Sequence, residues 1–169
     1  MTAQASALVV VESYWGNTAA VASAVADGLR AGGVEVTVAG AADAPARVDP
    51  GIRLVLVGAP THNMRLPSTP TRRQAAQRGA AVAAAGVAEW ITTARFGANV
   101  TVLAFDTHVE SRFSGSAARH AAQLLRRTTV ASVGERFVVA GEPPRLGDGE
   151  LDRARAWGTR LAGDLVPAP

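Results

Sequence analysis

Short apolar runs recur along the chain and alternate with stretches of helical spacing. The runs are rich in valine and mostly bounded by Gly, Pro, Asp or Asn, a pattern typical of strands. Several are nearly continuous in apolar character, as expected of parallel strands that are covered on both faces. One run alternates and therefore suits an edge strand. The predicted strands span residues 7–11, 34–38 (the alternating run), 53–58, 99–105 and 136–141.

Helical spacing separates these strands. Val21, Val25 and Leu29 recur every four residues and predict a helix that stops at the glycines of residues 31–33. A second helix is predicted around residues 117–125, and a last one from about 149 to 162 with Asp148 as its cap. Strands that alternate with helices predict an α/β fold: a three-layer, doubly wound, parallel sheet of five strands.

The connection between residues 59 and 98 is too long for one plain crossover. Ser68 or Thr69 could cap a helix that has Pro70 at its start. A second helix is expected around residues 86–93, after an alanine-rich stretch of low complexity. Part of this connection is therefore expected to be a surface excursion.

Length and composition predict a single domain over residues 1–169. The chain has a mass of 17.3 kDa and 48% hydrophobic residues, which are globular values. No run of 18 apolar residues predicts a membrane span, and residues 1–10 lack the basic region of a signal peptide, so a cytoplasmic location is expected. The absence of cysteine excludes disulfides, thiolate metal sites and cysteine nucleophiles.

The charge is unusual because all 17 basic residues are arginine. A net charge of +3 and an isoelectric point near 10.8 raise the alternative of nucleic-acid binding. The arginines are spread over many segments, and Ala, Gly, Val and Pro are abundant too. A compositional bias explains this pattern better, so no nucleic-acid partner is expected.

The loops that follow three of the strands are rich in hydroxyl, amide, histidine and aromatic side chains. In an open parallel sheet, ligands bind at the carboxyl ends of the strands. The loops at the opposite end of the sheet, such as AGG and FGA, are poorer in these side chains. The three candidate segments are ESYWGNT (12–18), APTHNMRLPS (59–68) and DTHVESRFSGS (106–116).

The first of these segments suits a phosphate. The first turn of a helix leaves backbone N–H groups unpaired and carries partial positive charge. Ser13, Asn17 and Thr18 could add side-chain donors, while Gly16 permits an unusual φ. A plainer alternative is that Asn17 or Thr18 only caps the helix. The chain lacks GxGxxG and GK[ST], which disfavours a dinucleotide site and an ordinary NTPase.

At these residues the chain resembles the flavodoxins. Their signature is an apolar strand, a Ser or Thr, a small residue, a Thr, and then aliphatic helix positions. Here these places are filled by Val9, Val10, Ser13, Gly16, Thr18, Ala22 and Val25. The segments VGAPTHNMRLP and FSGSAA, the latter preceded by AFDT, resemble the second and third flavin loops of the family.

The resemblance implies a flavodoxin-like fold with strand order 2-1-3-4-5 that holds FMN non-covalently. The phosphate would lie on the first loop, the isoalloxazine ring between the second and third loops, and Tyr14 and Trp15 would wall off the cofactor. The FMN-binding residues would be Ser13, Tyr14, Trp15, Gly16, Asn17, Thr18, Pro60, Thr61, His62, Asn63, Met64, Asp106, Thr107, His108, Ser114 and Gly115.

Two features depart from the family. Flavodoxins usually hold the ring between aromatic side chains, whereas the second loop here offers His62 and the third offers His108 or Val109. Ordinary flavodoxins are acidic, whereas this chain is basic. The second and third loops and the residues just after them carry Arg65, Arg72, Arg73 and Arg112. The implied function is electron transfer between redox partner proteins, and the arginines favour partners with an acidic docking face.

Other functions stay open at this point. An FMN-dependent NAD(P)H:quinone reductase and a flavin-less interaction module are compatible with the same fold. His62, His108 and Asp106 could in principle meet at a metal, and Ser13, His62 and Asp106 could form a hydrolytic triad. The histidines lack helical metal-ligand spacing and the GxSxG elbow is missing, so neither a metal site nor a catalytic residue is predicted. The oligomeric state is not predicted.

Overall fold

The computed structural model describes residues 4–166 and contains one six-stranded sheet between two layers of helices. The chain runs through the elements in this order: β1 (Ser6–Val11), α1 (Asn17–Ala31), β2 (Glu35–Gly40), β3 (Ile52–Pro60), α2 (Thr69–Gln77), α3 (Val87–Thr93), β4 (Thr101–Val109), α4 (Ala117–Leu125), β5 (Ala131–Ala140), β6 (Arg145–Leu146) and α5 (Glu150–Leu165). Among these residues, none of the helices is long and apolar enough to cross a membrane.

The sheet confirms the expected α/β fold and adds one strand. Its order is β2-β1-β3-β4-β5-β6, and β1 to β5 are parallel. The additional strand, β6, has two residues and pairs antiparallel with β5. The alternating segment forms the edge strand β2, as predicted.

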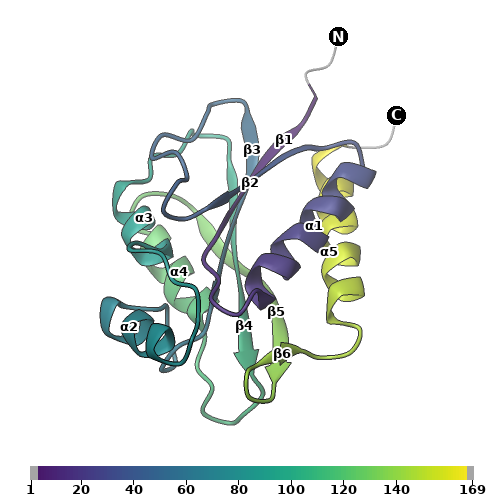
Figure 1. Cartoon of the computed structure of the whole chain (residues 1–169). Coiled ribbons are helices and arrows are strands. Elements are labelled where there is room, and N and C mark those ends of the chain that lie inside the picture. Colours follow the sequence, from purple (N-terminus) through teal and green to yellow (C-terminus); the bar gives the residue numbers. More distant parts are fainter. Residues whose placement is uncertain (1–3, 167–169) are drawn as a thin grey trace.

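Helices α1 and α5 cover one face of the sheet, and α3 and α4 cover the other (Figure 1). The core between β1, β3 and α1 is built from aliphatic side chains such as Val9, Val21 and Leu56. Trp90 and Trp157 are both buried in the packing layers. Helix α2 lies apart from both layers, beside the carboxyl ends of the strands (Figure 1).

Several boundaries differ from those expected. β4 continues to Val109, because residues 106–107 pair with both β3 and β5 and residues 108–109 pair with β5. Asp106, Thr107 and His108 therefore belong to the strand rather than to a loop. β5 starts at Ala131, five residues before the apolar run. The pattern missed this part because residues 132–136 are exposed or half-buried. Gly149 with φ of 79°, rather than Asp148, precedes α5.

Candidate functional site

A pocket of about 300 Å³ opens at the carboxyl ends of the parallel strands. This is at the small end of the range for ligand pockets, roughly 300–1,000 Å³. Four strand ends contribute to it, together with one face of α2. Its lining residues are Ser13, Tyr14, Trp15, Asn17, Thr18, Pro60, Thr61, His62, Asn63, Thr71, Gln74, Ala75, Arg78, Thr107, His108, Val109, Val139, Gly141, Glu142 and Pro144.

The loop after β1 presents a row of backbone donors to this pocket. Gly16 precedes α1 with φ of 84°, which turns the chain from the strand into the helix. Ser13 Oγ accepts a hydrogen bond from Ala19 N at 3.2 Å. Within residues 4–166, the backbone N–H groups of residues 13–18 donate no hydrogen bond. Successive free N–H groups at a helix N-terminus form an anion-binding concavity.

The polar side chains of this loop are engaged elsewhere in the fold. Thr18 is buried, and its hydroxyl lies 2.8 Å from that of Thr107 on β4. The side-chain amide of Asn17 donates to the Pro144 carbonyl at 2.8 Å. Neither residue caps the helix by a side-chain hydrogen bond, so the plain capping alternative is wrong. These contacts fix the loop against β4 and the end of β5.

The loop after β3 makes a tight turn. His62 and Arg65 exchange two backbone hydrogen bonds of 2.9 and 3.0 Å. Between them, Asn63 and Met64 have positive φ values of 45° and 70°. Asn tolerates this conformation, whereas Met rarely adopts it, so the turn is held by its surroundings. Met64 supplies that support by accepting a hydrogen bond from Ser116 N at 3.0 Å.

His62 lies against Tyr14, with the ring centroids 5.0 Å apart and the planes tilted by 35°. Burial lowers the pKa of His62 below its ordinary value, and the neighbouring Glu12 only partly opposes this effect. Burial, reinforced by the hydrogen bond to Glu12, raises the pKa of Tyr14. Both rings are therefore uncharged near neutral pH and form an aromatic edge of the pocket.

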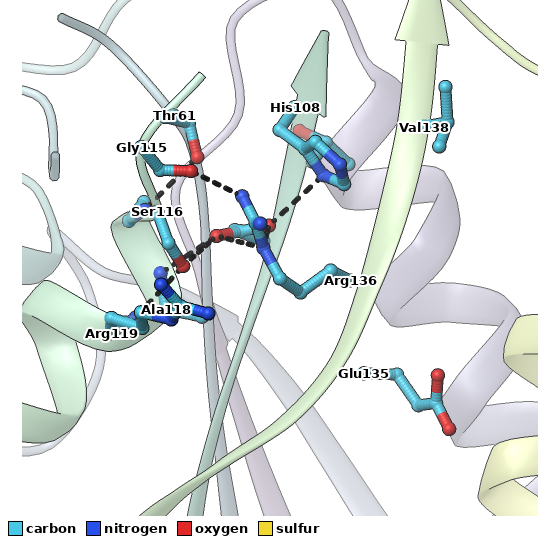
Figure 2. A network of polar contacts seen from close by, with 12 residues as sticks. Thr61, His108, Gly115, Ser116, Ala118, Arg119, Glu135, Arg136 and Val138 are labelled. Atoms are coloured by element: carbon cyan, nitrogen blue, oxygen red, sulfur yellow. Dashed lines mark hydrogen bonds and ion pairs between the residues drawn. The ribbon is translucent and has the colours of Figure 1, made fainter. Parts of the chain in front are cut away.

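At the end of β4, residues 107–109 line the pocket, whereas Asp106 belongs to a buried polar network. Asp106 is fully buried and accepts hydrogen bonds from Ser116 Oγ at 2.7 Å and Ala118 N at 3.0 Å. Arg136 donates to the same carboxylate at 2.9 Å and to the Gly115 carbonyl at 2.6 Å (Figure 2). The network ties β4 and β5 to the start of α4. Asp106 is thus turned away from the pocket.

His108 connects this network to the pocket. Its side chain is 12% exposed, and its Nδ1 lies 3.4 Å from Asp106 Oδ1 (Figure 2). Within residues 4–166 this buried Nδ1 makes no hydrogen bond. Burial and the charge of Arg136 lower the pKa of His108, while Asp106 and Glu110 oppose them. His108 is therefore neutral at neutral pH, with a ring edge available to a ligand.

The structure brings most of the predicted site residues together. Those that line the pocket are Ser13, Tyr14, Trp15, Asn17, Thr18, Pro60, Thr61, His62, Asn63, Thr107 and His108. The others lie outside its lining: Gly16, Met64, Asp106, Ser114 and Gly115. Gly16 and Met64 shape the turns, whereas Asp106 and Gly115 belong to the network of Arg136. That any of these residues contacts FMN stays a prediction.

Sequence reasoning missed two parts of the lining. Thr71, Gln74, Ala75 and Arg78 of α2 and the turn after it carry a recognisable signal, since their spacing of i, i+3, i+4 and i+7 places them on one helical face. The segment that follows β5 contributes Gly141, Glu142 and Pro144. This segment follows the end of a strand, as the other three segments do, and that position could have identified it as part of the site.

The basic residues around the loops fall into two groups. Arg72 is buried and ion-paired with Glu12 and Glu89, so the expectation that it is free to surround the ring is wrong. Arg65, Arg73 and Arg112 are exposed, and among the residues described none of them pairs with a carboxylate. In the same part of the chain, no group of three or more His, Asp or Glu side chains is placed to hold a metal ion.

No protein-family model matches this sequence, and no curated protein matches it. Solved structures do resemble it. A flavodoxin from the domain Archaea superposes with a TM-score of 0.63 and 20% identity, covering 95% of this chain and 98% of that one. Oxidised flavodoxin 1 from Bacillus cereus gives a TM-score of 0.69 and 16% identity, covering 96% and 100%.

A metal-soaked flavodiiron core from Synechocystis sp. is also similar, with a TM-score of 0.62 and 20% identity. The likeness covers 97% of this chain and 36% of that chain. At such low identities the superpositions establish the fold and leave the activity to be argued from the site. The chain has a flavodoxin-like fold, in agreement with the resemblance of its loop motifs to those of the flavodoxins.

Proposed function

We propose that this protein binds FMN non-covalently and carries electrons between redox partner proteins. The free backbone N–H groups of residues 13–18 carry the proposal, because they form an anion cradle at the N-terminus of a 15-residue helix. The pocket begins at this cradle. A ligand with a terminal phosphate satisfies these donors, and FMN is such a ligand in the family that the chain resembles.

The rest of the pocket fits the remainder of FMN. The strand ends at Pro60 and at Thr107 are paired in the sheet, so the second and third loops flank one space. His62 and His108 are neutral, ring-shaped groups at its sides, in the places where flavodoxins usually have aromatic residues. The bound flavin supplies the electron chemistry, while the protein sets binding, orientation and potential.

The second and third loops carry exposed apolar and basic side chains. Met64, Val109 and Phe113 are exposed at the ends of the second and third loops, and Arg65 and Arg112 adjoin them. Apolar side chains within a basic surround favour a protein partner whose docking face is acidic. The proposed redox partners are therefore acidic around their own cofactor.

A second candidate function is supported by the polar face of α2. An FMN-dependent NAD(P)H:quinone reductase needs room for a second substrate beside the flavin. Gln74 and Arg78 extend the pocket beyond the three loops and could provide it. NAD(P)H-dependent turnover of a quinone by the FMN-loaded protein would favour the reductase, and its absence would favour the carrier.

Binding of FMN and riboflavin tests the leading proposal. We expect the purified protein to be yellow, or to become so with FMN, and to quench FMN fluorescence on binding. Riboflavin lacks the phosphate and should bind at least about tenfold more weakly, because charge-assisted hydrogen bonds to the cradle are lost. Equal affinities for FMN and riboflavin would contradict the assignment of the first loop to the phosphate. A colourless protein that cannot be loaded would favour an interaction module.

A further inference from the structure

Arg72 is the only large side chain of helix α2 that is buried. Only Arg72 and Ala75 are buried among the residues of α2, and the side chain of Arg72 is 4% exposed. Alanine offers little apolar surface, so hydrophobic packing contributes little to the position of this helix. Its place beside the strand ends (Figure 1) therefore depends on what Arg72 binds.

Arg72 joins α2 to two other elements. Its Nε donates to Glu12 Oε1 at 2.6 Å, directly after β1. Its two terminal nitrogens donate to the carboxylate of Glu89 on α3 at 2.9 and 2.6 Å. A planar guanidinium that makes a bidentate pair fixes orientation as well as distance. Hydrogen bonds with both carboxylates raise the pKa of Arg72 against the effect of burial, so Arg72 keeps its charge. We call Arg72, Glu12 and Glu89 the clamp.

Glu12 is the other centre of this clamp. Its Oε2 accepts a hydrogen bond from Val87 N at 2.9 Å, and its Oε1 accepts one from the Tyr14 hydroxyl. Gly86 leaves the space that this carboxylate occupies, since a Cβ there would lie 2.2 Å from it. One buried carboxylate thus connects the end of β1, the pocket residue Tyr14, α2 and the start of α3.

The pocket side of α2 is polar. Thr71, Gln74 and Arg78 share the face that lines the pocket, opposite the loops after the strands. Their hydroxyl, amide and guanidinium groups can donate hydrogen bonds to phosphate or carbonyl oxygens. No oxygen of a protein carboxylate within residues 4–166 pairs with Arg78. Its charge is therefore available to a ligand.

We propose that α2 and the turn after it form a fourth wall of the ligand site, in which Gln74 and Arg78 donate hydrogen bonds to oxygen atoms of the bound ligand. Arg72 is the positioning residue that keeps this wall in place through Glu12 and Glu89. The proposal rests on the proposed binding of FMN and adds a contact surface to the three loops.

Substitutions on the exposed positions test the wall directly. Arg78→Gln should weaken FMN binding about five- to tenfold, the loss of one charge-assisted hydrogen bond, and Gln74→Ala about threefold. Arg73→Gln is the matched control, because Arg73 is an exposed arginine on the same helix that does not line this pocket; it should change the affinity less than about twofold. Equal affinities of the Arg78→Gln and Arg73→Gln variants would overturn the proposal.

Riboflavin identifies the ligand atoms. If Arg78 contacts the phosphate, Arg78→Gln should leave riboflavin binding unchanged. If it contacts a ring carbonyl, the variant should weaken FMN and riboflavin by the same factor. Either result supports the wall, whereas unchanged binding of both ligands overturns it.

A double-mutant cycle tests the role of Arg72. Arg72→Gln should speed FMN dissociation at least about tenfold, and in that background Arg78→Gln should add little, because the wall has already moved. An Arg72 that only stabilised the fold would leave the effect of Arg78→Gln at full size, and that result would overturn the positioning role. If Arg72→Gln does not fold, Arg72→Lys keeps the charge, loses the bidentate geometry and serves in the same cycle.

The two proposals fail in different ways. A wild-type protein that does not bind FMN would overturn the proposed function, and the fourth wall with it. A wild-type protein that binds FMN, with α2 variants that bind it equally well, would overturn the fourth wall alone.

Discussion

At the scale of single residues, Thr18 illustrates how a motif position serves the fold. The resemblance assigns it to the phosphate, whereas its buried hydroxyl lies 2.8 Å from that of Thr107. We expect Thr18→Val to lower the free energy of unfolding by about 1–2 kcal/mol, because it leaves a buried hydroxyl without a partner. Urea denaturation of Thr18→Val, Thr107→Val and the double variant checks this. Strictly additive losses would contradict a direct hydrogen bond.

Because its three histidines have lowered pKa values, we expect the protein to lose stability on mild acidification. Burial lowers the pKa of His62, His108 and His120 in the folded protein, and the charge of a neighbouring arginine lowers each of them further. The unfolded chain therefore binds protons first as the pH falls below about 6.5. Stability is fully present above that pH and is lost toward the lower pKa values of the folded protein, by up to about 1.4 kcal/mol per pH unit for each histidine.

His62→Gln provides the check on this sign. Urea denaturation at a series of pH values between 7.5 and 5 should show a shallower decline for this variant than for the wild type. The acidic groups with lowered pKa, Glu89 and Glu150, titrate below this window and cannot mimic the effect. A stability that is constant over this range, or an unchanged slope in the variant, would contradict burial of a neutral His62.

Pocket residues could be predicted from the sequence where their place at a strand end decides their position. The prediction failed where a partner far away in the chain decides it. Ser13, His62 and Thr107 come within a few residues of the end of an apolar run, so the end of a strand predicts their place. Asp106 has the same position, yet it binds Arg136, 30 residues later in the chain. No local pattern tells which face of the strand such a carboxylate takes. The same limit hid the partners of Arg72, which lie 60 and 17 residues away.

At the scale of elements, the close contact between α1 and α5 depends on two glycines. A Cβ on Gly28 would lie 2.1 Å from the Arg155 carbonyl oxygen, and one on Gly158 would lie 2.1 Å from that of Val25. Both obstacles are backbone atoms, which cannot rotate away. Gly28→Ala and Gly158→Ala should each lower the free energy of unfolding by about 2–3 kcal/mol.

Gly163 is the matched control for these two glycines. It lies on the same helix, α5, and an added Cβ would meet no heavy atom of the described chain within 4 Å. Gly163→Ala should therefore raise stability by about 0.5–1 kcal/mol, through helix propensity alone. Thermal or urea unfolding of the three variants measures the difference. A Gly28→Ala protein as stable as Gly163→Ala would contradict the packing of α1 on α5.

Helices and strands could be predicted from the sequence where their apolar residues follow one regular spacing. The valine runs predicted the strands and the four-residue spacing predicted α1, whereas the correct sheet order was implied by the family resemblance. The start of β5 and the two-residue strand β6 lack an apolar run, because they are partly exposed and held by backbone pairing. The excursion was expected to contain one helix starting near Pro70 and another around residues 86–93, and these are α2 and α3. Its role in the pocket was not foreseen, since that depends on tertiary contacts of Arg72.

At the scale of the whole molecule, the arginines divide by function. Arg72 and Arg136 are paired with buried carboxylates and hold elements together. Arg65 and Arg112 are exposed on the second and third loops, and Arg78 lines the pocket. Charges of the second kind act through solvent, and salt screens them over a Debye length of about 8–10 Å. Only this group can adjust the potential of a cofactor without changing the fold.

We therefore expect reduced FMN to be held more readily here than in an acidic flavodoxin. A unit charge about 10 Å from the flavin contributes about 0.4 kcal/mol in water, so Arg65 and Arg112 together should raise the midpoint potential of the last reduction step measurably. Potentiometry of the FMN-loaded protein should show that potential falling as salt is added. Arg65→Gln and Arg112→Gln should lower it at low salt, and Arg127→Gln, an exposed arginine just after α4 at the opposite end of the sheet, should not. A potential that is insensitive to salt and to the first two substitutions would mean that these arginines act on neither the flavin nor, through the same field, an acidic partner.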